Sequence, residues 1–205
     1  MYLSRVKLDI SNRKTMMAMA SPNLFHGAVE NAFTGERKRN LWRIDTLRGC
    51  PYLLILSPDR PDLSDIAAQF GFIAPQIDAE IKNYRPLLDR IENNSHWHFK
   101  LTANPVKSVS AKERGEIHAH VTPYYQKKWL LDRAEKHGFL LREDEFDVVH
   151  SQWYTFQKGI NRAVLFAATY EGGLTVTDSD LFRDVLINGI GHGKAYGMGL
   201  MTIVR

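Results

Sequence analysis

The sequence contains little cysteine and no long hydrophobic run. Cys50 is the only cysteine among 205 residues, which excludes an intramolecular disulfide and a cysteine-based metal site. No stretch of about 18 apolar residues occurs, and the first residues lack the apolar segment of a secretory signal. These absences argue against a secreted or membrane-spanning protein. We therefore expect a cytoplasmic protein that makes no membrane contact.

Charge is ordinary in amount but uneven along the chain. The 27 Lys and Arg residues against 23 Asp and Glu residues give a net charge of +4. Residues 1–48 carry a net +5 and residues 93–128 a net +4, whereas 49–92 and 129–205 are acidic. Two basic segments are expected in a protein that binds a polyanion. Two solvated faces that alternate by chance would give the same pattern.

The first 92 residues alternate between strand and helix patterns. Apolar alternation predicts strands at 2–9, 41–48, 52–56 and within 73–84. Cap and proline signals predict helices after Ser11-Asn12, after Pro22 and at 63–70. The resulting order, β-α-β-β-α-β, is that of a ferredoxin-like domain.

Residues 93–205 repeat this order. Strands are predicted at 96–103, 147–156, 163–176 and 200–204. Helices are predicted at 123–137, ended by Gly138, and at 181–187, capped by Asp178, with an inserted hairpin or loop at 106–121. The sequence therefore predicts an α+β fold of two tandem ferredoxin-like (RRM-like, βαββαβ) domains, at 1–92 and 93–205.

The predicted helix after Pro22 carries one apolar stripe with a histidine beside it. The stripe consists of residues at helical spacing that we expect to be buried: Leu24, Phe25, Ala28, Val29 and Ala32. His26 is the only histidine before residue 96 and lies in a basic segment. A histidine in such a place is more often structural than catalytic, so the pattern leaves both roles open.

Five of the 14 glycines lie within residues 189–199. A Walker A loop would need glycine at Asn188 and Ser or Thr at Ala195, and a Rossmann fingerprint would have to open a βαβ unit, for which too few residues follow. What remains is a glycine loop between a helix and a strand, carrying Lys194. Such a loop allows backbone N–H groups to approach phosphates, or it forms a tight packing turn.

Four segments together resemble the CasE family of CRISPR-associated endoribonucleases (type I-E, Cse3-like). They are MYLSRV at 1–6, LWRI at 41–44, LTANPVK at 101–107 and GIGHGKAYGMGL at 189–200. The resemblance spans both halves of the chain and includes the tandem ferredoxin-like architecture. The glycine loop and the ANPxK stretch are its most specific parts.

The resemblance implies a metal-independent, cofactor-free endoribonuclease that cuts precursor CRISPR RNA at the base of the repeat hairpin. A 2′-hydroxyl attacks the neighbouring phosphate, which leaves a 2′,3′-cyclic phosphate and a 5′-hydroxyl. It further implies that the enzyme keeps the mature guide RNA and joins other subunits of a type I-E interference complex (Cascade). A non-catalytic RNA-binding subunit of the same complex is the alternative.

His26 matches the family's catalytic histidine, and histidine suits proton transfer because its pKa lies near working pH. Two neighbours depart from the family pattern. Asn23 stands where some relatives carry a tyrosine, and Gly27 stands where a relative can carry a basic residue. Tyr196 is a candidate substitute for the missing hydroxyl group.

Recognition of an A-form hairpin is expected to depend on phosphate contacts. The predicted RNA-binding residues are Lys107, Lys112, Arg114, Lys127, Lys128, Lys158, Arg162, Gly191, Gly193 and Lys194. The densest basic run, Arg37-Lys38-Arg39, is either a further contact or a solvated surface. His96-x-His98 and His118-x-His120 form a third hypothesis, a metal-binding ferredoxin-like protein, although exposed strand positions explain both pairs.

Overall fold

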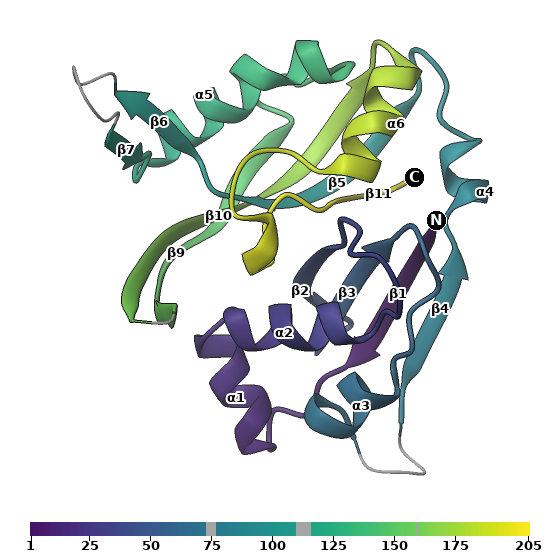
Figure 1. The fold of residues 1–205 in the computed structure, drawn as a ribbon. Coiled ribbons are helices and arrows are strands. Elements are labelled where there is room, and N and C mark those ends of the chain that lie inside the picture. The colour runs from purple at the N-terminus through teal and green to yellow at the C-terminus, as the bar shows by residue number, and fades with distance from the viewer. Residues whose placement is uncertain (73–76, 110–115, 159) are drawn as a thin grey trace. The chain divides into compact units, whose positions relative to one another are not determined.

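The computed structural model describes residues 1–72, 77–109, 116–158 and 160–205 (Figure 1). The chain forms two compact units. The first consists of Met1–Arg90, Tyr154–Val164 and Lys194–Gly197, and the second of Ile91–Trp153, Leu165–Gly193 and Met198–Arg205. Each unit therefore takes most of its residues from one half of the sequence, but the first also includes two short segments from the other half. The predicted contiguous domains, 1–92 and 93–205, stay a prediction.

The first unit contains a four-stranded antiparallel sheet in the order β2-β3-β1-β4. Its elements are β1 (Tyr2–Lys7), α1 (Arg13–Ala20), α2 (Asn23–Asn31), β2 (Leu41–Leu47), β3 (Cys50–Ser57), α3 (Ser64–Phe70), β4 (Ala79–Asn83) and the short α4 (Arg85–Leu88). Element order and strand order together are those of a ferredoxin-like domain, as predicted.

Local signals set the start of the two helices that precede β2. The Asn12 side chain accepts a hydrogen bond from the Lys14 backbone N–H and so caps α1. Pro22 follows the break at Ser21 and precedes the first residue of α2. The predicted restart of the helix at Pro22 is therefore confirmed.

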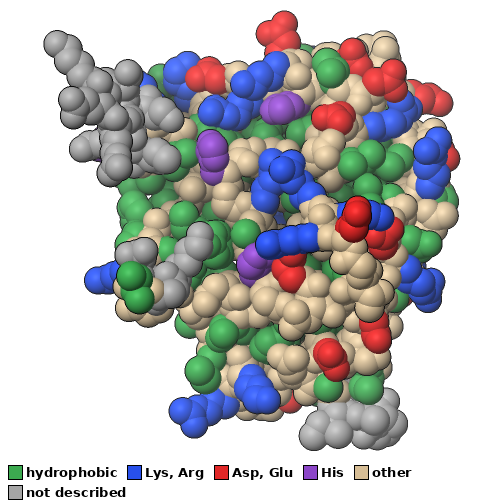
Figure 2. Space-filling view, in the orientation of Figure 1, with side chains coloured by type: hydrophobic (Ala, Val, Ile, Leu, Met, Phe, Trp, Pro, Cys, Tyr) green, Lys and Arg blue, Asp and Glu red, His purple; other side chains and the backbone are tan. Residues whose placement is uncertain are grey.

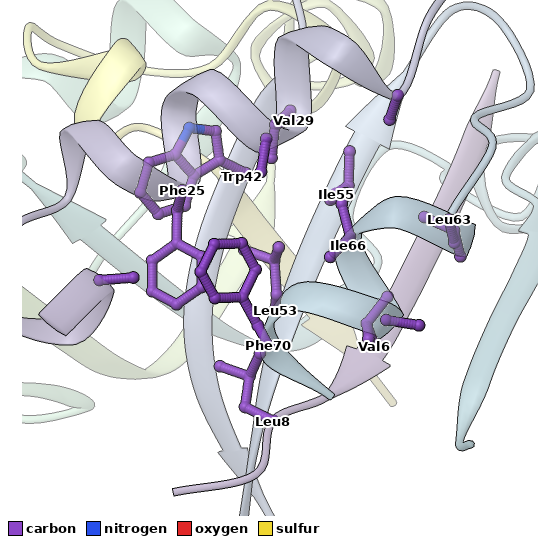
Figure 3. Packing of buried hydrophobic residues seen from close by; sticks show 14 residues of the cluster. Val6, Leu8, Phe25, Val29, Trp42, Leu53, Ile55, Leu63, Ile66 and Phe70 are labelled. Atoms are coloured by element: carbon purple, nitrogen blue, oxygen red, sulfur yellow. The ribbon is translucent and has the colours of Figure 1, made fainter. Parts of the chain in front are cut away.

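The core of the first unit lies between these helices and the sheet (Figure 3). The Phe25 ring lies 4.9 Å from the Phe70 ring and 5.9 Å from that of Trp42, centroid to centroid. Four members of the predicted stripe, Phe25, Ala28, Val29 and Ala32, are buried. The prediction for Leu24 is wrong, because Leu24 is exposed. It lies about 100° around the helix from Phe25, outside the i, i+3, i+4, i+7 stripe.

The second unit has the same topology with one insertion. Its ferredoxin-like elements are β5 (His96–Ala103), α5 (Pro123–Ala134), β9 (Phe146–Lys158), β10 (Asn161–Val176), α6 (Ser179–Asn188) and β11 (Met201–Val204). The remaining elements are β6 (Val106–Val109), β7 (Glu116–Ala119), η1 (Glu135–His137), β8 (Phe139–Leu140) and η2 (Lys194–Tyr196), of which η2 belongs to the first unit. The sheet order is β11-β5-β10, and both β8 and β9 pair with β10.

The structure confirms the α+β class and the tandem ferredoxin-like arrangement. Asp178 caps α6 through its side chain, and Gly138 ends η1 in the left-handed conformation, as the sequence predicts. The predicted insertion after β5 contains the antiparallel pair β6-β7. Within the described ranges, no helix is long and apolar enough to cross a bilayer.

Candidate active site

His26 lies in α2, and the packing of that helix determines where its ring points. The preceding residue, Phe25, is buried in the core, whereas the following one, Gly27, is exposed. The backbone N–H of His26 donates to the Pro22 carbonyl at 3.1 Å, which places the residue in the first full turn of the helix. The imidazole is half-buried. It is therefore held by a rigid element and is still accessible to a ligand.

Arg37 is the charged group that contacts this imidazole. Its Nη2 lies 3.5 Å from His26 Nε2, and its Nε lies 2.5 Å from Glu30 Oε2. Glu30 is four residues after His26 and thus on the same face of α2. The carboxylate therefore anchors the guanidinium group beside the histidine. Figure 2 shows histidine, basic and acidic side chains together on the visible face of the molecule.

This contact favours one tautomer of His26. A guanidinium group has only donors, so Nε2 accepts from it and the ring proton of neutral His26 resides on Nδ1. Nε2 thus carries a lone pair on the side of the ring that faces Arg37. A ring nitrogen in this state is the form of histidine that accepts a proton from a substrate hydroxyl.

Tyr196 supplies an aromatic hydroxyl near His26. The short helix η2 packs against both α2 and β2. The Tyr196 ring lies 6.4 Å from the His26 ring and 4.9 Å from the Phe156 ring, centroid to centroid. Phe156 is buried and comes from the β9 segment of the first unit. The structure thus brings the predicted substitute residue and the histidine together within one compact unit.

Asn23 and Gly27, the two departures from the family pattern, occupy the same helix. Asn23 Oδ1 accepts a hydrogen bond from Ser21 Oγ at 2.8 Å, so this side chain supports the start of α2. Gly27 is exposed, and a Cβ built on it would meet no atom within 4 Å. A larger residue fits at position 27 without any change in packing.

Lys194 lies two residues before Tyr196 and is half-buried. Burial lowers the pKa of its ammonium group, and the nearby Arg39 cation lowers it further. Each of these cations would be stabilised by a bound phosphate, because a phosphate offsets their mutual repulsion. In the basic run, Lys38 pairs with Asp59 at 2.8 Å. The three residues of the run therefore differ in their contacts. Arg37 contacts the His26 imidazole, Lys38 forms a surface ion pair, and Arg39 lies near Lys194.

Gly197 connects the glycine loop to the core of the first unit. Its φ of +79° lies in the left-handed region, and an added Cβ would lie 2.7 Å from Trp42 Cζ3. Trp42 is itself buried. The close approach of backbone to indole fixes the position of η2, and with it that of Tyr196. This close packing explains why position 197 is a glycine, a question that the sequence pattern alone left open.

Replacing Gly197 with alanine is expected to lower the free energy of unfolding by about 2–4 kcal/mol, from the left-handed conformation and the clash with Trp42. Gly27→Ala is the matched control, because its site is a helix interior with open space. It is expected to raise the free energy of unfolding by about 0.5–1 kcal/mol. Chemical denaturation of both variants measures these two changes in the free energy of unfolding. Equal stability of Gly197→Ala and wild type would contradict the role given to Gly197.

The predicted RNA-binding residues occupy varied environments. Lys107 is exposed on β6, and Lys128 is exposed on α5, where it pairs with Asp132 at 3.0 Å. Lys127 is largely buried: its Nζ donates to the Glu143 carbonyl at 2.7 Å. Arg162 is exposed on β10. The Lys127 ammonium group has three donors, so it could contact RNA and keep this internal bond.

The other predicted residues are either glycines of the loop or lie where the structure describes no side chain. Lys112 and Arg114 lie outside the described residues, and of Lys158 only the backbone position at the end of β9 is described. Gly191 and Gly193 have φ values of +78° and +80°, so their backbone conformation favours glycine. Their roles in RNA binding stay predictions.

The histidine pairs do not form a recognisable metal site. His96 Nδ1 lies 2.9 Å from Thr175 Oγ1, and His98 is exposed on the same strand. Among the residues that the structure describes, no group of three or more His, Cys, Asp or Glu side chains is arranged to hold a metal ion.

Sequence reasoning missed Arg37 and Glu30 as partners of His26. The acid is at helical spacing from His26, which is a usable signal, but the arginine comes from the loop that follows α2. No sequence periodicity predicts which cation of the run Arg37-Lys38-Arg39 turns toward the helix.

The comparisons with known proteins agree with this architecture. The family model described as "CRISPR associated protein" matches residues 1–205, and the chain belongs to this family, as a member of its CasE (Cse3) branch.

Three relatives illustrate the match. The CRISPR-associated endoribonuclease Cse3 of Thermus thermophilus is 28% identical over 219 residues, which cover 99% of each chain. A structure of CRISPR endoribonuclease Cse3 bound to a 19-nucleotide RNA is 25% identical, with a TM-score of 0.83 over 100% of both chains. Thermus thermophilus Cse3 bound to an RNA that represents a pre-cleavage complex is 26% identical, with a TM-score of 0.82 over 100% of this chain and 98% of the other.

Proposed function

We propose that this protein is a metal-independent endoribonuclease that binds the repeat hairpin of precursor CRISPR RNA and cuts it. The observation that carries the proposal is His26, with its Nε2 facing Arg37 and its ring beside Tyr196. Membership of the family and likeness to an endoribonuclease seen with bound RNA support the same activity. The enzyme would work in the cytoplasm, keep the mature guide RNA and join other subunits of an interference complex.

In the proposed reaction, the 2′-hydroxyl of the nucleotide before the cut attacks the adjacent phosphorus. A bond forms between the 2′-oxygen and phosphorus, and the bond from phosphorus to the 5′-oxygen breaks. The 2′-proton passes to His26 Nε2, and a proton must reach the departing 5′-oxygen. The products are a 2′,3′-cyclic phosphate and a 5′-hydroxyl, so the atoms balance without water.

Three neighbouring groups would assist. Arg37 turns from Nε2 to a non-bridging phosphate oxygen as the hydroxyl takes its place, and its guanidinium group then stabilises the developing charge. Tyr196, whose ring lies 6.4 Å from that of His26, would direct its hydroxyl to the same phosphate or to the leaving oxygen. Lys194, whose pKa is lowered by burial, lies in η2 with Tyr196 and would add a second cation to that of Arg37.

The test is to incubate the protein with a CRISPR repeat RNA in excess EDTA and to measure binding and cutting separately. Cutting in EDTA is the expected result. Binding without cutting would instead support the non-catalytic RNA-binding subunit. Cutting that appears only after a divalent metal ion is added would overturn the metal-independent mechanism.

A further inference from the structure

A second candidate site lies wholly within the second unit, separate from His26. It is a pocket of about 420 Å³ whose wall comes from β6, His120, the length of α5 and the glycine loop. This volume lies in the range of small-molecule pockets and is too small for a duplex. The loop is held in place by the bridge between His192 and Asn104, which lies directly after β5. The shape is therefore a property of the folded unit.

Aromatic rings form one side of the pocket. The rings of His120 and Tyr125 are stacked, with an interplanar angle of 21° and centroids 5.7 Å apart. Tyr125 is about half exposed. The backbone of His120 is fixed on both sides, because its N–H donates to the Pro105 carbonyl and its carbonyl accepts from Gln126 Nε2. The Tyr125 ring therefore rests on a rigid support, and the Tyr124 ring contacts it edge-on with centroids 5.2 Å apart. The exposed part of the Tyr125 ring is the surface on which a planar ligand would stack.

Trp129 and Arg133 form the deeper part of the wall. Trp129 is buried, and Gly191 packs against its indole, since a Cβ there would lie 3.0 Å from Cη2. The Arg133 guanidinium group lies 4.3 Å from the centre of the Trp129 ring and donates to the Trp129 carbonyl. Both side chains are thus held by contacts inside the unit.

The pocket is positively charged. Lys107, Lys128 and Arg133 line it, and Asp132 is the single carboxylate among its described lining residues. Asp132 pairs with Lys128 at 3.0 Å, and its charge also acts on Arg133. With three cations against this one carboxylate, the described lining keeps a net positive charge. Burial lowers the pKa of His120, and the Lys107 and Arg133 cations lower it further. The imidazole is therefore mainly neutral at pH 7 and acts as a stacking surface.

We propose that this pocket binds one unpaired nucleotide of the RNA substrate. The base would stack on Tyr125, supported by His120, and the phosphate would lie against Lys107 and Arg133. Aromatic rings next to cations are the usual recognition of unstacked RNA bases. Bases inside a duplex cannot present their faces, so the nucleotide must come from a flank, bulge or loop. The proposal rests on the proposed function, because it assigns a further contact for the same RNA.

The test couples one protein variant with single abasic substitutions at each unpaired position of a CRISPR repeat RNA that has single-stranded flanks. With wild-type protein, one abasic position is expected to weaken binding by about 5- to 150-fold, the equivalent of one stacked base. Tyr125→Ala should weaken binding of the intact RNA by a similar factor and show no further loss at that position. Tyr125→Phe should restore the affinity.

Tyr124→Ala is the matched control, because Tyr124 is exposed and does not line the pocket; it removes the ring that contacts Tyr125 edge-on but leaves the Tyr125 ring itself and its stack on His120 in place. It should keep the full sensitivity to the abasic RNA. Additive losses for Tyr125→Ala at every unpaired position, or equal losses for both tyrosine variants, would overturn the pocket while leaving the nuclease intact. A wild-type protein that neither binds nor cuts repeat RNA would overturn the proposed function, and the pocket proposal with it.

Discussion

Replacing His26 with alanine is expected to slow the cleavage of repeat RNA by about 10²- to 10⁴-fold, the usual contribution of a positioned general acid or base. The physical reason is that no other described ring nitrogen of the first unit is available to take the 2′-proton. Binding should change little, because affinity for a hairpin comes mainly from phosphate contacts by lysine and arginine. Single-turnover rates with saturating protein, together with an equilibrium dissociation constant, separate the two effects.

The variant is expected to fold. His26 is half-buried at the edge of the core, and alanine is the residue most favourable in a helix. His96→Ala is the control, because His96 is exposed on β5 of the second unit, where its Nδ1 contacts Thr175. It should cut at the wild-type rate. Unchanged cutting by His26→Ala would remove His26 from the catalytic assignment.

Replacing Arg37 with alanine is expected to lower the single-turnover cleavage rate by about 10- to 100-fold. The expected loss is smaller than for a fully enclosed donor, because the Arg37 side chain is 75% exposed and screened by water. Two functions are lost together: the donor that keeps the proton of His26 on Nδ1, and the cation available to the phosphate. The effect should appear in the rate at saturating protein more than in the dissociation constant.

Two further variants distinguish this role from a general loss of charge. Arg37→Lys keeps the charge without the planar guanidinium group, so it should recover part of the rate. Lys38→Ala removes the adjacent cation, whose ammonium group pairs with Asp59, and should cut at nearly the wild-type rate. Equal losses for Arg37→Ala and Lys38→Ala, or an effect confined to binding, would contradict the assignment.

Local signals in the sequence were sufficient for most of the fold. The cap at Asn12, the break at Pro22, the terminator Gly138 and the cap at Asp178 each act within a few residues. The strand and helix patterns between them give the β-α-β-β-α-β order twice. Leu24 shows the limit of this reasoning, because one helical position separates a buried side chain from an exposed one.

The candidate site depended on contacts that local patterns do not contain. Tyr196 reaches His26 from 170 positions further along the chain, because η2 belongs to the first unit. Phe156 comes from the β9-β10 hairpin, whose end belongs to the same unit. Arg37 was visible only as part of a basic run. The family resemblance pointed to His26, but only the tertiary fold supplies its neighbours.

The most direct measurement concerns the nucleophile. After the cut is mapped, a repeat RNA with a single 2′-deoxy nucleotide before the cut is compared with the all-ribose RNA, in excess EDTA and with product masses determined. If the 2′-hydroxyl attacks, only the all-ribose RNA is cut, and its upstream product has the mass of a 2′,3′-cyclic phosphate. Cutting of the deoxy RNA, or an upstream product that ends in a 3′-hydroxyl, would contradict the mechanism.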